Sequence, residues 1–159
     1  MPETPSPAAL LPAVSDSLPV RLLRAREAVM QRVRPILRAH DVTEQQWRVL
    51  RMVRDLKETE VTVLAGEAFL LAPSLSRILR DLAARGLLTR RSADGDQRRS
   101  VVSLTDEGRA LIARAEPELS EASVEVHSLF GAERLDALKR LLTELESALA
   151  LPDRTGEAL

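Results

Sequence analysis

Four side chains suited to contacting nucleic acid lie on the outer face of one predicted helix: Ser74, Ser76, Arg77 and Arg80. Arginine donates paired hydrogen bonds to guanine edges, and short hydroxyls bind phosphates or bases. The free backbone N–H groups at the start of the helix could also bind a phosphate. An isolated amphipathic helix would carry the same arginines merely as a solvated face, so the interpretation depends on the elements around it.

A basic loop follows this helix and lies between two predicted strands. Leu87 to Arg91 and Ser100 to Leu104 have the composition of short strands, and Asp94-Gly95 is a turn signal. In the loop, Arg98 and Arg99 follow Asp96, whose carboxylate could hold one guanidinium in a fixed pose for a DNA groove, the alternative being a plain surface ion pair. The candidate DNA contacts are Ser74, Ser76, Arg77, Arg80, Arg90, Asp96, Arg98 and Arg99.

Hydrophobic periodicity predicts the helices that must position this unit. One helix runs from Pro19 to about Ala39, with a kink or break at Pro35. The next starts at Thr43, whose spacing to Gln46 fits a capping box. A polar turn over residues 57–60 and a short helix over 62–69 then lead into the basic helix, which ends at Gly86. Its inward face is predicted to consist of Leu71, Leu75, Ile78, Leu79 and Leu82.

Two further helices follow the hairpin. Thr105 and the acids after it favour a helix that extends to about Leu129. After Gly131, leucines recur at the spacing of a coiled-coil seam. They are Leu135, Leu138, Leu142, Leu145 and Leu149.

Charge is segregated along the chain, although the net charge is only −1. Residues 20–54 hold nine Arg against three acids, whereas residues 105–159 hold twelve acids against six basic residues. A mildly acidic protein can therefore present a local basic face to phosphate, because screening limits the reach of the other charges.

The composition argues against several other classes of protein. There is no Cys and there are only two His, far apart, so neither a metal site, a cofactor nor a catalytic nucleophile with a base is indicated. The N-terminal segment lacks the features of a signal peptide, and no apolar run is long enough to span a membrane. We expect a cytoplasmic protein that is not an enzyme.

The arrangement of three short helices and a hairpin resembles the MarR family of bacterial regulators. The segments that carry the likeness are TEQQWRVLR, LLAPSLSRILRDLAARGLLTRR and DGDQRRSVVSLTDEGRAL. With LLRAREAVMQRVRPILRAH, the sequence is similar to the branch of homoprotocatechuate-pathway repressors, over roughly residues 18–150. The family's wing carries an Asp-x-Arg pattern whose Arg enters the minor groove, which maps onto Asp96 and Arg98. Gln97 and Gly66 depart from the usual pattern.

The resemblance also implies a dimer built from the first and last helices, and a cleft that binds aromatic carboxylates and so releases DNA. Arginines in the first helix could pair with a carboxylate, and an aromatic or thioether side chain could contact a ring. The candidate ligand contacts are Arg21, Arg24, Arg26, Met30, His40 and Trp47. Alternatives stay open: the arginines could form dimer ion pairs or face solvent, Trp47 could be core, and His40 could cap its helix.

The sequence thus predicts a mainly α protein with a small β-hairpin, a winged helix-turn-helix with dimerisation helices at both ends. The expected organisation is a tail over 1–17, dimerisation helices over 18–42 and 105–150, the DNA-binding domain over 43–104 and a flexible end over 151–159. Its expected partners are a pseudo-palindromic duplex DNA, an aromatic acid and a second copy of the chain. The alternatives are a helical protein-interaction module and a DNA-binding protein without an effector.

Overall fold

The computed structural model describes residues 16–93 and 96–149, and the side chains of residues 92–99 lie outside that description. The chain forms two units, which divide between Leu119 and Ser120 and are treated separately. The first unit holds α1 (Leu18–Ala39), α2 (Glu44–Leu56), β1 (Glu58–Glu60), α3 (Val61–Glu67), α4 (Ala72–Ala84), β2 (Leu88–Ala93), β3 (Asp96–Leu104) and the start of α5 (Asp106–Phe130). The rest of α5 and α6 (Ala132–Leu149) belong to the second unit.

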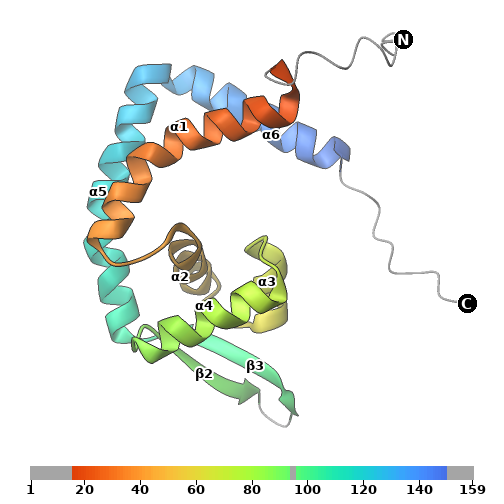
Figure 1. The fold of residues 1–159 in the computed structure, drawn as a ribbon, viewed down its shortest axis with the longest axis vertical. Helices are drawn as coiled ribbons and strands as arrows, with labels where there is room; N and C mark the ends of the chain where they lie inside the picture. The colour runs from red at the N-terminus through yellow and green to blue at the C-terminus, as the bar shows by residue number, and fades with distance from the viewer. Residues whose placement is uncertain (1–15, 94–95, 150–159) are drawn as a thin grey trace, which may run out of the picture. The chain divides into compact units, whose positions relative to one another are not determined.

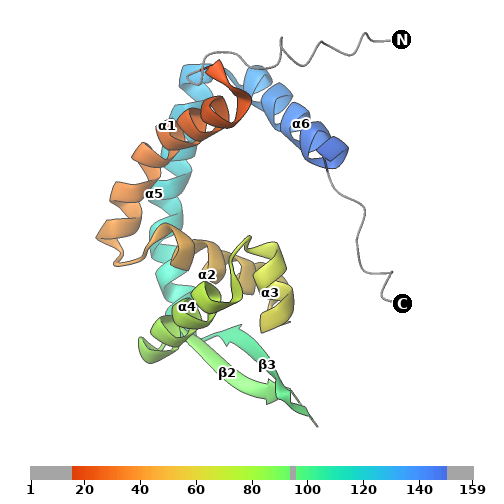
Figure 2. The same ribbon diagram turned by 45° about the vertical axis from the view of Figure 1, so that its right-hand side comes forward.

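The first unit also contains an antiparallel sheet in the order β1-β3-β2, with β1 between α2 and α3 in the chain and β2 and β3 after α4. Figures 1 and 2 show β2 and β3 projecting from these helices as a two-stranded wing. The fold is therefore the predicted winged helix-turn-helix, mainly α with one small sheet.

Leucine and valine side chains from the helices and the wing form one core. Leu50 of α2, Leu64 of α3, Leu75 and Leu82 of α4, and Val102 of β3 are all fully buried. Burying a leucine or valine side chain contributes about 1.5–3 kcal/mol. This core fixes α4 against the wing, and it determines which side of α4 faces outward.

The helix termini follow the local sequence signals. Thr43 and Gln46 form the predicted capping box at the start of α2, with Thr43 Oγ1 accepting from the Gln46 N–H at 3.1 Å and Gln46 Oε1 accepting from the Thr43 N–H at 2.9 Å. Gly86, after the end of α4, has φ +69°, a left-handed conformation that glycine adopts without a Cβ penalty. Pro35 lies inside α1, which ends at Ala39 as predicted.

Three sequence predictions need correction. The segment predicted as a polar turn contains β1, whose Thr59 pairs with Val102 at the edge of the wing sheet. Leu71 is 78% exposed instead of inward-facing, because the helix starts after it and leaves it in the turn. The basic loop is mostly strand, since β3 begins at Asp96. The predicted turn at residues 94–95 lies outside the described residues.

In the second unit, α6 has the predicted leucine spacing but buries none of its residues. Of the predicted seam, Leu138 and Leu149 are 38% and 67% exposed, and Leu135, Leu142 and Leu145 are partly exposed. An apolar helix face left open in this way is available to another surface.

Candidate nucleic-acid interface and ligand cleft

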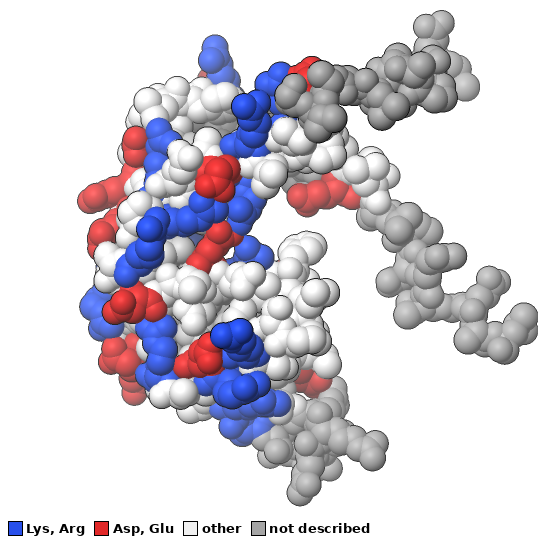
Figure 3. Space-filling model, in the orientation of Figure 1, with Lys and Arg blue, Asp and Glu red and all other residues white. Residues whose placement is uncertain are grey.

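The outer face of α4 presents the side chains that the sequence suggested for DNA contact. Ser74, Ser76, Arg77 and Arg80 are all exposed, and the leucines on the opposite side hold that face outward. Figure 3 shows basic side chains gathered over α4 in the lower half of the view. Among the side chains that the structure describes, those of residues 16–91 and 100–149, neither Arg77 nor Arg80 has an ion-pair partner.

Arg90 lies on β2 of the wing, exposed and oriented by a hydrogen bond from its Nε to Ser100 Oγ at 3.0 Å. The adjacent Arg91 donates from Nε to Glu58 Oε1 of β1 at 2.8 Å. The other three predicted wing residues, Asp96, Arg98 and Arg99, have backbones in β3, but their side chains lie outside the described residues. Their proposed contacts therefore stay predictions.

The base of the wing is tied to the end of α4 and the start of α5. Thr105 Oγ1 donates to the Gly86 carbonyl at 2.6 Å and accepts from the Gly108 N–H at 3.0 Å. At Gly108 the backbone lies so close to the Leu87 carbonyl oxygen that an added Cβ would be 2.2 Å from it. These contacts fix the position of the hairpin relative to α4.

A cleft of about 490 Å³ lies between α1 and α2. Its apolar wall consists of Met30, Val33, Leu37, Trp47 and Met52. Its polar wall consists of Arg26, Glu44, Arg48, Arg51 and Asp55. Apolar walls with a few polar groups are typical of sites for small organic molecules.

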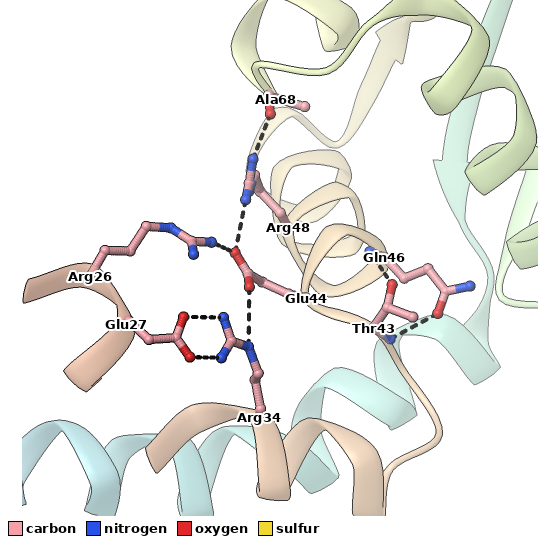
Figure 4. Close-up of polar contacts among 8 residues, drawn as sticks. All are labelled: Arg26, Glu27, Arg34, Thr43, Glu44, Gln46, Arg48 and Ala68. Carbon is pink, nitrogen blue, oxygen red and sulfur yellow. Dashed lines mark hydrogen bonds and ion pairs between the residues drawn. The ribbon is translucent and has the colours of Figure 1, made fainter. Parts of the chain in front are cut away.

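Glu44 lies at the centre of an arginine cluster in this cleft, as Figure 4 shows. Its carboxylate contacts Arg26 Nη2, accepts from Arg48 Nη2 at 3.2 Å and lies 3.7 Å from Arg34 Nε. Arg34 in turn donates to both carboxylate oxygens of Glu27, one of them at 2.8 Å. This hydrogen bonding lowers the pKa of Glu27 and raises that of Arg34.

Arg51 differs from the other arginines of the cleft, because it is exposed and has no ion-pair partner in the described part of the chain. The nearby Asp55 carboxylate accepts from Arg54 Nε at 2.9 Å. Arg54 also donates to Glu116 of α5, and these two hydrogen bonds, with Glu116 the larger cause, raise the pKa of Arg54. The guanidinium of Arg51 is therefore available to an anion from solution.

The structure brings together only half of the ligand contacts predicted from sequence. Arg26, Met30 and Trp47 line the cleft, and Trp47, only 8% exposed, is also part of the core. Arg21 pairs with Asp16, outside the cleft.

Arg24 is exposed and does not line the cleft either. His40 is the C-cap of α1, and its Nε2 lies 2.9 Å from Glu118 Oε1. Sequence reasoning missed Arg48 and Arg51. The signal for Arg51 was present, because it follows Trp47 by four residues and so shares its helix face.

No group of His, Cys, Asp and Glu side chains that could hold a metal ion occurs in residues 16–93 and 96–149. In the same part of the chain, no single helix meets the length and hydropathy requirements of a membrane span. The bent pair α3 and α4 meets them jointly, by length and composition only. The apolar side chains of α4 are accounted for by the core.

Comparison with known proteins gives consistent results. The sequence model described as the MarR family matches residues 40–99. The homoprotocatechuate degradative operon repressor of Escherichia coli is 42% identical over 129 residues, which cover 81% of this chain and 87% of that protein. The crystal structure of NadR in complex with 4-hydroxyphenylacetate is 37% identical, with a TM-score of 0.71, covering 85% and 97% of the two chains. The transcriptional repressor CouR bound to a 23-mer DNA duplex is 28% identical, with a TM-score of 0.77, covering 83% and 94%.

Proposed function

Because the chain belongs to the MarR family and is a DNA-binding transcriptional repressor, not an enzyme, we propose that an aromatic carboxylic acid binding between α1 and α2 releases it from its operator. The observation that carries the proposal is Arg51, which has no ion-pair partner among the described residues, in a cleft that is also lined by apolar side chains. A guanidinium binds a carboxylate through paired hydrogen bonds, and Trp47 and Met30 offer contacts to a ring.

The DNA contacts are proposed to come from α4 and the wing. In this proposal Arg77 and Arg80 reach base edges in the major groove, and Ser74 and Ser76 bind phosphate or base. Arg90 of the wing contacts the backbone, and Arg98, held by Asp96, enters the minor groove. Two observations support this assignment: the α4 residues are exposed, and neither Arg77 nor Arg80 has an ion-pair partner among the described side chains.

The proposed operator is pseudo-palindromic, since proteins of this family dimerise and we expect this chain to do so. In the first unit, α1 exposes Leu18, Leu22, Leu23 and Val29. In the second unit, the leucine seam of α6 is also open. A two-fold dimer would present its recognition helices about 34–36 Å apart to successive major grooves. Its target is the chromosome, which supports the predicted cytoplasmic location.

Two relatives favour an aromatic acid as the effector. NadR has been crystallised with 4-hydroxyphenylacetate, and the Escherichia coli relative is named for the degradation of homoprotocatechuate. The acid would act by binding the dimer that is not competent for DNA more tightly than the competent one. The acid can change the equilibrium constant between the two dimers by no more than the ratio of its affinities for them.

The experiment needs an operator and a panel of acids. A duplex selected by the protein from a random library serves as operator, and hydroxyphenylacetates, hydroxybenzoates and hydroxycinnamates serve as ligands. Trp47 is the only tryptophan, so its fluorescence reports occupancy of the cleft directly. We expect at least one acid to change this fluorescence and to release the duplex.

Arg51→Met tests the anchor, with Arg24→Met as the matched control, because Arg24 lies on α1 outside the cleft. The first substitution should weaken binding of the acid about tenfold or more, and the second should not. If no acid binds while the duplex is still bound tightly, the protein is a DNA-binding repressor without such an effector. If no duplex is bound with an affinity that falls as salt rises, phosphate contacts are absent and a protein-interaction module is the better interpretation.

A further inference from the structure

We propose that Glu44 makes the cleft selective for acids with a single negative charge and excludes those with two. This inference rests on the proposed binding of an aromatic acid, and it adds the charge class of the ligand. It follows from the number and pairing of the charges that line the cleft.

The cleft has one positive charge more than its own carboxylates neutralise. Its wall carries three arginines, Arg26, Arg48 and Arg51, against two acids, Glu44 and Asp55. Counting the ion-pair partners of these groups keeps the excess at one, because Arg34 and Arg54 add two positive charges and Glu27 and Glu116 add two negative ones. Of the three lining arginines, Arg26 and Arg48 contact Glu44, which leaves Arg51 without a partner among the described residues. A ligand with one carboxylate restores neutrality, whereas a second carboxylate has no free cation in the cleft to bind.

The carboxylate of Glu44 is fixed in place, so it cannot easily give way to a ligand. Glu44 is the first residue of α2, directly after the Thr43 capping box, where the helix dipole stabilises a negative charge. Its side chain is only 23% exposed and receives donors from α1 and α2 together. Figure 4 shows it between Arg26, Arg34 and Arg48.

A second carboxylate on the ligand would meet this fixed charge in a partly enclosed site. Because the site is only partly solvated, repulsion between like charges is screened less than in water. Like charges brought together at an interface act mainly on specificity, by disfavouring the wrong partner. Glu44 therefore leaves the binding of a monocarboxylate to Arg51 largely intact and penalises a dicarboxylate of the same size.

Glu44 could instead only hold α1 against α2, since it bridges arginines of both helices. A purely structural role predicts that its loss weakens the binding of every acid in the same proportion. Selectivity by charge predicts a change in the ratio of two affinities, which a loss of stability does not produce. The ratio is therefore the quantity to measure.

The test compares phenylacetate, with one carboxylate, and homophthalate, which carries a second carboxylate on the same ring. Binding to the full chain is followed by the fluorescence of its single tryptophan, Trp47. In the wild-type protein, homophthalate should bind about tenfold or more weakly than phenylacetate. In Glu44→Gln, which keeps the hydrogen-bonding shape but removes the charge, that ratio should fall to about threefold or less.

Glu27→Gln is the control, because Glu27 is also an arginine-paired acid of this region but does not line the cleft. In Glu27→Gln the ratio of the affinities for phenylacetate and homophthalate should stay at the wild-type value. An unchanged ratio in Glu44→Gln, with phenylacetate still bound, overturns the selectivity of Glu44 and leaves the proposed function intact. If neither acid binds to either protein, while other monocarboxylates fail as well, the proposed function itself is wrong and this inference with it.

Discussion

Arg48 connects the ligand cleft to the helix-turn-helix, because its guanidinium donates from Nη1 to the Ala68 carbonyl at 3.0 Å. Its other terminal nitrogen, Nη2, donates to Glu44 at 3.2 Å. Ala68 is the C-cap of α3, and the turn after it leads through Phe69, at φ +50°, into α4. Figure 4 shows Arg48 between Glu44 and Ala68. One side chain thus contacts both the ion pairs of the cleft and the turn that precedes the basic helix.

Arg48→Met should uncouple these two sites. We expect the acid still to bind, more weakly because the cleft loses one positive charge, and its effect on operator affinity at saturation to fall. Allosteric couplings typically change affinity by about 5–150-fold, so a reduction is measurable. The measurement is operator affinity with and without saturating acid. Arg38→Met on α1, outside the cleft, should keep full coupling, and undiminished coupling in Arg48→Met would show that the signal travels elsewhere.

Arg77→Ala and Arg80→Ala should each weaken operator binding by about 1–3 kcal/mol if the side chain reads a base. A side chain that contacts only phosphate should instead reduce the slope of log affinity against log salt by about one. Titrations of the selected duplex at several salt concentrations separate the two cases. Arg114→Ala on α5, where Arg114 pairs with Glu107, is the control and should change neither quantity.

Arg98→Ala tests the wing. Loss of this guanidinium should weaken operator binding without changing the thermal midpoint of unfolding, because residue 98 lies in the wing strand β3 and an arginine seldom contributes to a hydrophobic core. Operator titration and thermal unfolding on the same preparation are the two measurements. Wild-type affinity for the operator would remove Arg98 from the mechanism.

Gly108→Ala should lower the free energy of unfolding by about 1–3 kcal/mol or more, as forced overpacking does. The new Cβ would lie 2.2 Å from the Leu87 carbonyl oxygen and 2.9 Å from Leu104 Cδ2, so backbone must move. Gly66→Ala is the matched control, since its Cβ would meet nothing within 4 Å and α3 would gain up to about 1 kcal/mol. Urea unfolding gives the free energy of unfolding of both variants. Equal changes of the same sign in the two variants would contradict the close approach at Gly108.

The pKa of Glu27 is lowered chiefly by its hydrogen bonds from Arg34. A lowered folded-state pKa stabilises the fold above the ordinary carboxyl pKa, and this contribution is lost as the pH falls through the lowered value. Arg34→Gln should therefore return the pKa of Glu27 toward its ordinary range. A carbon NMR titration of the carboxyl group measures this directly. Glu27→Gln should lack the corresponding loss of stability on the acid side.

Much of the fold was predictable from local patterns, because the residues that determine it are near neighbours in the sequence. The capping box of Thr43 and Gln46, the stop at Gly86 and the amphipathic pattern of α4 each depend on a few adjacent positions. The resemblance in the wing and α5 depended on similarly short segments. The sequence pattern alone therefore predicted the outward basic face of α4, with no information on tertiary contacts.

Other features depended on contacts between distant segments. β1 exists because Thr59 finds Val102 across the sheet, and three polar residues alone carry no strand signal. The pairing of Arg26 with Glu44 and of Arg48 with Ala68 depends on how α1, α2 and α3 pack, so sequence could not choose among the nine arginines of residues 20–54. The sequence by itself determined that the chain carries a basic recognition helix and a wing. Only the tertiary structure decided which arginine of the cleft stays unpaired, because ion pairing depends on distances in space.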